Sequence, residues 1–212
     1  MKKIIVFVLA MALVLGNGFM MFEGVMASAA STSTGTTGIG GAVSLTYPVE
    51  VTVGPELTLN CDTSTSTMTP PLSGVSGGSA SSTRDCVVIT NNLTGYVLNL
   101  TPSTSPALQN TVSSTITFAN LQASPIAWAA ASGANTWFGF TVSGTDSDGA
   151  FSGGTLWRGF SGTNLVQIAS RNIATAVTGV TSTVEWGASV GPTAAQPSGL
   201  YRAWVTVTAY MQ

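Results

Sequence analysis

The sequence predicts an all-β fold, a single antiparallel β-sandwich of eight to ten short strands. Three observations lead to this prediction. Apolar and polar residues alternate with a period of two in many short segments, as they do in half-buried strands. Gly, Pro, Ser and Asn residues that favour turns separate these segments. No segment combines a helical hydrophobic period with caps, since the best candidate, residues 126–131, is short and is followed by Ser132-Gly133.

The first 29 residues have the three parts of a secretory signal peptide. Two lysines precede an apolar stretch from Ile4 to about Phe22, and the small residues at positions 27–29 follow. We therefore expect cleavage near Ala30 and an extracellular or cell-surface protein. The apolar stretch approaches the roughly 20 residues that span a bilayer, so an uncleaved anchor stays open as an alternative.

The predicted domain covers residues 42–212, after a flexible segment. Residues 30–41 are Ser, Thr, Gly and other small residues and predict a linker or mobile arm. Alternation begins at Ala42, in AVSLTYPVEVTV, and predicts a half-buried strand over residues 42–53. Pro48 interrupts it, which favours an edge position or a break between two short strands.

The remaining strands are expected at residues 56–61, 86–90, 96–100, 115–119, 137–142, 155–160, 183–190 and 201–210. Residues 62–85 hold two adjacent prolines, three glycines and many Ser and Thr residues, and predict a long surface loop. Cys61 and Cys86 stand at its two ends. In an exported chain they are expected to form a disulfide, which would contribute on the order of 3.5 kcal/mol in the chain-entropy model.

The charged residues exclude two classes of partner. Without residues 1–29 the chain holds no lysine and no histidine, and its four arginines face seven carboxylates, a net charge of about −3. There is no basic cluster for nucleic acid and no polybasic patch for a membrane surface. We therefore expect no nucleic-acid partner, and no membrane contact after signal cleavage.

The same composition predicts that the protein is not an enzyme and needs no cofactor. Ser-His-Asp and Ser-Lys nucleophiles, P-loops and His-ligated zinc all require residues that the expected mature chain lacks. A pair of carboxylates could still hydrolyse a glycoside. Glu185 is the first to examine, but the alternation of Val184-Glu185-Trp186 predicts that its side chain faces solvent.

One segment has the spacing of a metal loop. Asp146-Ser147-Asp148-Gly149 places alternate aspartates before a glycine, an arrangement that can wrap oxygen ligands around calcium. The next four residues, Ala150 to Gly153, add no further acidic ligand. We therefore favour a hairpin turn, and keep Asp146 and Asp148 as a calcium candidate only.

Two segments of similar sequence carry aromatic residues, Trp137-Phe138-Gly139-Phe140 and Trp157-Arg158-Gly159-Phe160. In a strand the Trp and the Gly share one face, so a large ring could cover the bare glycine backbone of a neighbouring strand. Packing of this kind is the favoured interpretation. The alternative is an aromatic platform that stacks on sugars.

Three stretches together resemble a known group of proteins: residues 88–98 (VITNNLTGYVL), residues 134–140 (ANTWFGF) and residues 196–209 (QPSGLYRAWVTVTA). The set resembles secreted or cell-surface β-sandwich proteins of bacteria, themselves uncharacterised. The last stretch is also similar to the closing strand of pilin and spore-coat-U-type domains. This resemblance covers about residues 85–212 and implies an Ig-like or pilin-like sandwich.

The last predicted strand suggests how the protein acts. Its inward face is expected to hold Tyr201, Ala203, Val205, Val207 and Ala209. Arg202, Trp204 and Tyr210 lie on the other face, which carries more aromatic surface than a solvent-facing strand needs. We expect either a loop or another subunit to cover it.

We therefore expect a structural subunit that assembles with itself or with other surface proteins through strand edges, with residues 30–53 as the donated segment. The alternative is a monomeric adhesin or carbohydrate-binding module, with glycans as partners. It would use exposed tryptophans, of which the sequence offers Trp128, Trp137, Trp157 and Trp204.

Overall fold

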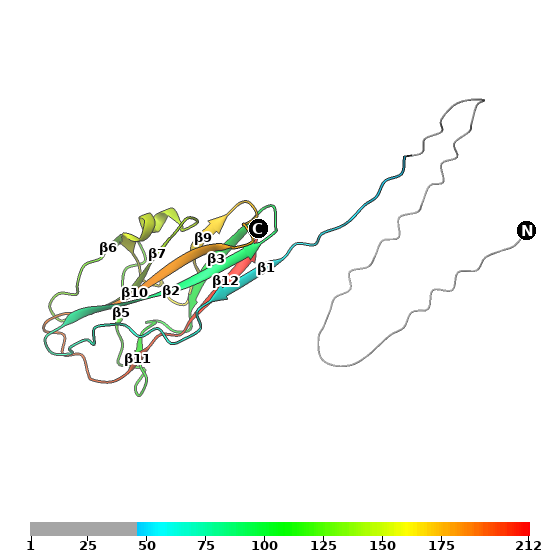
Figure 1. The fold of residues 1–212 in the computed structure, drawn as a ribbon. Coiled ribbons are helices and arrows are strands. Elements are labelled where there is room, and N and C mark those ends of the chain that lie inside the picture. Colours follow the sequence, from blue (N-terminus) through cyan, green and yellow to red (C-terminus); the bar gives the residue numbers. More distant parts are fainter. Residues whose placement is uncertain (1–45) are drawn as a thin grey trace, which may run out of the picture. The chain divides into compact units, whose positions relative to one another are not determined.

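A computed structural model describes residues 46–212 and shows an all-β fold, as predicted (Figure 1). The expected signal peptide at 1–29, the linker at 30–41 and the first four residues of the expected strand at 42–53 lie outside the described residues. Within the described range no helix is long and apolar enough to cross a membrane. The elements are β1 (Leu57–Cys61), β2 (Gly78–Thr90), β3 (Tyr96–Pro102), β4 (Gln109–Asn110), β5 (Ala119–Asn120), β6 (Ile126–Ala127), β7 (Thr136–Gly144), the 3-10 helix η1 (Gly149–Gly154), β8 (Leu156–Trp157), β9 (Val166–Arg171), β10 (Val180–Val190), β11 (Tyr201–Arg202) and β12 (Val205–Met211).

Two sheets carry the core of residues 52–212, which form one unit. The larger sheet has the order β1-β2-β10-β7-β5, and the smaller one has the order β12-β3-β9. All neighbours are antiparallel except β5 and β7. Alternate residues of both sheets enter one hydrophobic cluster, in which Val88, Phe140, Leu98 and Ile168 are fully buried. This burial of every second residue explains the period-two pattern of the sequence.

The disulfide between Cys61 and Cys86 is confirmed. The two cysteines lie directly opposite each other in the β1–β2 ladder, with Cα atoms 4.1 Å apart. The expected loop over residues 62–85 is wrong in its second part, because β2 already begins at Gly78 and pairs with β10 from Gly78 to Val88. Ser and Thr dominate this part of β2, so only the partner strand, not a local apolar pattern, determines its structure.

Four further segments differ from the sequence prediction. Strand β9 was not predicted, because a register shift beside Leu98 places both Ile168 and Ala169 in the core and breaks the alternation. The strand expected over residues 201–210 is two strands, β11 paired with β4 and β12 paired with β3. The expected strands at 115–119 and 155–160 shrink to the two-residue strands β5 and β8. Residues 126–131, which were too short to predict a helix, are not helical, in agreement with the sequence prediction.

Candidate assembly surface

One side of the two sheets is formed by their edge strands β1 and β12. The two strands belong to different sheets, but pairs of their Cα atoms lie within 8 Å, and Figure 1 shows them side by side. Their core-facing residues are only partly buried, unlike those of the central strands. These residues are Leu57, Leu59 and Cys61 of β1 and Val205, Val207 and Ala209 of β12. We call the side made by β1 and β12 the open edge.

The backbone of β12 is also unpaired along the open edge. The Ser103 N–H donates to the Trp204 carbonyl (2.8 Å), and the Gln212 N–H donates to the Gly95 carbonyl (3.2 Å). In this antiparallel ladder the even-numbered residues of β12 therefore bond to β3, and the odd-numbered ones direct their N–H and C=O groups to the other side. Within residues 46–212, β12 pairs with β3 alone. It therefore presents a free strand edge.

Few hydrogen bonds join the two chain segments that line this edge. Among the described residues, one backbone hydrogen bond connects residues 57–77 with residues 194–212, from the Gln196 N–H to the Gly74 carbonyl (2.8 Å). Met68, Leu72 and Ala203, from the same two segments, are also partly buried apolar residues packed against the core. The seam between the first and last strands is thus held by partial apolar packing more than by hydrogen bonds.

A turn at one end of the open edge fastens both segments. The Asn91 side chain accepts from the Glu56 N–H (2.6 Å) and donates to the Gly54 carbonyl (2.9 Å), so it holds the chain just before β1. The Asn92 side chain donates to the Gln212 carbonyl (2.9 Å), just after β12, and Thr94 bonds the same carbonyl. The sequence of this Asn-Asn turn supports a resemblance to other proteins, but its structural role was not predicted. Side-chain amides beside a turn glycine were the available signal.

The residues that precede β1 expose an apolar row. Residues 46–56 have no helix, strand or turn, so the half-buried strand expected up to residue 53 is absent. The alternate side chains of Tyr47, Val49, Val51 and Val53 are 76%, 85%, 90% and 78% exposed. An alternating pattern can bury one face only when a partner strand lies beside it. We call residues 46–53 the arm.

The structure divides the predicted binding surface into two parts. Trp204 is 66% exposed, and the Arg202 guanidinium carbon lies 5.3 Å from the centroid of its ring, a cation–π contact. Tyr210 is also exposed, but lies six residues further along the chain, near the end of β12, about 20 Å away at 3.4 Å per residue. Arg202 and Trp204 therefore form one small site, and Tyr210 belongs to the far end of the open edge.

Most of the tryptophans proposed as sugar platforms pack against the protein. The rings of Trp128 and Trp157 are 4.6 Å apart and cover Gly187, where an added Cβ would lie 2.7 Å from Trp157. A ring over glycine was predicted, although the glycine is not one of the two in the similar segments. Trp137 is half-buried. Of the four tryptophans proposed for sugar binding, Trp204 is the one whose side chain is exposed.

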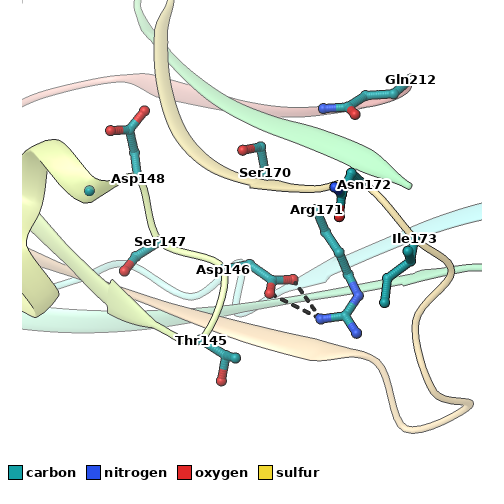
Figure 2. A pocket seen from close by; sticks show the side chains of 10 residues that line it. Thr145, Asp146, Ser147, Asp148, Ser170, Arg171, Asn172, Ile173 and Gln212 are labelled. Carbon is teal, nitrogen blue, oxygen red and sulfur yellow. Dashed lines mark hydrogen bonds and ion pairs between the residues drawn. The ribbon is translucent and has the colours of Figure 1, made fainter. Parts of the chain in front are cut away.

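The calcium candidate lies in an open polar hollow of about 520 Å³ (Figure 2). Asp146 is nearly buried and pairs with Arg171 (3.1 Å), and it accepts a hydrogen bond from the Tyr96 hydroxyl (3.0 Å). Asp148 points away from Asp146 and accepts from the Ala150 N–H (2.9 Å). The two carboxylates thus have separate structural partners. In the part of the chain that the structure describes, no three metal-ligating residues gather.

The pKa of one residue bound to Asp146 is shifted. Burial, and then the hydrogen bond to Asp146, raise the pKa of Tyr96 well above its ordinary value.

The carboxylate Glu185, first among the glycosidase candidates, lies opposite Thr83 and Thr141 in the ladders of β10, so neither directly paired residue is an acid.

Comparison with known protein families, curated proteins and solved structures finds no match to this chain.

Proposed function

We propose that this protein is a secreted structural subunit of the cell surface, an Ig-like or pilin-like β-sandwich that assembles into a surface layer or filament through strand edges. One observation carries the proposal. The same chain holds an open edge, with partly exposed core residues and a free β12 backbone, and an arm with an exposed alternating apolar row. The open edge lacks a strand that pairs with the β12 backbone and covers its core residues, and the arm lacks a partner strand beside its apolar row.

The energetics favour association of such surfaces. Full burial of one valine side chain contributes about 1.5–3 kcal/mol relative to exposure, and the arm holds three exposed valines. Strand addition would also pair the free N–H and C=O groups of β12. The low net charge adds little repulsion between copies.

The test is the oligomeric state of the exported chain with and without its arm. The full chain is produced with residues 1–29 in place, recovered after export, and compared with a variant that lacks residues 30–53 by sedimentation velocity. We expect polymers from the full chain and monomers from the variant. A full-length variant with Val49→Thr and Val51→Thr is the matched control, because it keeps the arm length and the β-branched shape and removes the apolar row.

Two results would overturn the proposal. One is unchanged sedimentation after deletion of the arm, and the other is a full chain that stays monomeric at high concentration. Circular dichroism and an intact disulfide between Cys61 and Cys86 establish that each variant is folded.

A second candidate function rests on Trp204, whose exposed ring lies beside Arg202. An aromatic ring with a neighbouring donor can stack on a sugar and bond its hydroxyl groups. In that case the protein is a monomeric adhesin or carbohydrate-binding module. Glycan-array binding that is lost in Trp204→Ala and kept in Trp128→Ala would select this function over self-assembly.

A further inference from the structure

We propose that the strand which completes the open edge is the arm of a second copy, and that it runs antiparallel to β12. This inference rests on the proposed function and adds the donated segment, its direction and its origin. It follows from three features: the length of the arm, the position of Pro48, and the Asn91 and Asn92 side chains, which bind Gly54 and Gln212 at the same end of the open edge.

The arm fits β12 in length and in pattern. The arm has eight residues and β12 has seven, which correspond to strands of about 27 and 24 Å. The apolar residues of the arm recur at every second position, as do Val205, Val207 and Ala209 of β12. One face of an added strand can therefore bury all four apolar side chains against the seam, while Glu50 stays on the solvent face.

Pro48 determines the direction of the added strand. The free N–H and C=O groups of β12 belong to the residues whose side chains face the core. In an antiparallel pair they bond to arm residues whose side chains lie on that same face, which are Tyr47 and the three valines. In a parallel pair they bond to the intervening residues, among them Pro48, which has no N–H. Only in the antiparallel direction does every arm residue that must donate a hydrogen bond to β12 have an N–H group.

This direction excludes the arm of the same chain. The Asn91 side chain donates a hydrogen bond to the Gly54 carbonyl, and the adjacent Asn92 side chain donates one to the Gln212 carbonyl. Gly54 therefore lies at the Gln212 end of β12. In the antiparallel register with full overlap, Val53 lies beside Val205, at the opposite end. That end is about 24 Å away, and Val53 is one residue, about 3.8 Å, from Gly54. The arm can reach its own β12 only in the parallel direction, which Pro48 disfavours.

The full-overlap register makes specific pairs. Val53, Val51 and Val49 lie opposite Val205, Val207 and Ala209. On the solvent face, Thr52 lies opposite Thr206, and Pro48 lies against the exposed ring of Tyr210. The aromatic residue at the far end of β12 thereby gains a contact.

Cysteine cross-linking between separate chains tests the direction. Full-length chains with Thr52→Cys are mixed with full-length chains that carry Thr206→Cys, and the mixture is assembled and oxidised. Mass spectrometry of the cross-linked peptides identifies the pairs. We expect a disulfide between positions 52 and 206 as the main product, because such non-hydrogen-bonded pairs bring Cβ atoms close together.

The matched control is Tyr210→Cys, on the same exposed face of β12 as position 206. A main product between positions 52 and 210 would show parallel insertion and overturn the inference. In a double variant, a 52–210 disulfide within one chain would show self-insertion and also overturn it. Assembly by sedimentation without either disulfide would refute the inference and leave the proposed function standing. Failure to assemble at all would refute both.

Discussion

The two sides of the paired sheets are completed in different ways. On the side of β7 and β9, which we call the covered edge, residues 145–160 bond to β9, the edge strand of the smaller sheet, and to β7, whose outer neighbour β5 pairs only with Trp137 and Phe138. The Ser170 N–H donates to the Asp146 carbonyl (3.0 Å), and the Phe140 N–H donates to the Arg158 carbonyl (2.8 Å). Between these contacts Phe151 is fully buried, with its ring 5.7 Å from that of Phe140.

The open edge lacks both of these features. Within the described residues, β12 has no second backbone partner, and no side chain fills the seam as Phe151 does, so the core-facing residues of β1 and β12 stay partly exposed. The comparison shows that an edge is closed by a backbone partner together with an apolar side chain. Residues 145–160 provide both in cis. Our proposal is that the arm of another copy provides them in trans.

The largest expected difference between the edges is in the effect of removing an apolar side chain. Phe151→Ala leaves a cavity in the covered edge and should lower the free energy of unfolding by about 3–5 kcal/mol. Val207→Ala on the open edge should cost only about 1 kcal/mol in the monomer, because its side chain is already partly in water. Urea unfolding followed by tryptophan fluorescence measures both, and equal losses would show that the two edges are equally closed.

The local pattern of the sequence predicted the strands that alternate and the cystine that joins two of them. Val88, Phe140 and Val184 are buried as the period of two requires. The features that distinguish the edges depend on distant partners and were not predicted. Phe151 lies in a segment that we interpreted as a hairpin turn, and its burial depends on strands from elsewhere in the chain.

The candidate assembly surface was also predicted only in part, because local sequence patterns do not show contacts between distant residues. The sequence placed Trp204 and Tyr210 on an outer aromatic face of one strand, whereas in the structure both are exposed and Trp204 lies between β11 and β12. No local pattern shows that Asp146 pairs with Arg171, 25 residues later, or that the Asn92 side chain donates a hydrogen bond to the Gln212 carbonyl. The exposure of the arm was missed because alternation shows that a strand can form but not that its partner is in the same chain.

The next largest effect concerns the ion pair that fastens the covered edge. Arg171→Met would leave the nearly buried Asp146 carboxylate without its counter-charge, and we expect a loss of about 3 kcal/mol in the free energy of unfolding. The double variant with Asp146→Asn should recover most of that loss, because it removes the uncompensated charge. If the double variant is as unstable as the single one, shape and not charge holds residues 145–160 in place.

The smallest effect is a pH dependence confined to the covered edge. Burial and the hydrogen bond to Asp146 raise the pKa of Tyr96 above its ordinary value of 10.0. Below pH 10 both the folded and the unfolded chain hold this proton, so the contribution of Tyr96 is fully present. Above pH 10 the unfolded chain ionises first, and stability should fall by up to about 1.4 kcal/mol per pH unit.

Tyr96→Phe should remove this slope. Unfolding in urea between pH 9 and about pH 11.5 measures it, and the difference between the two proteins isolates Tyr96, since the other tyrosines are common to both. Parallel curves would show that the Tyr96 hydroxyl does not contribute. A steeper fall in the wild-type chain would show that alkali weakens the contact between β3 and residues 145–160.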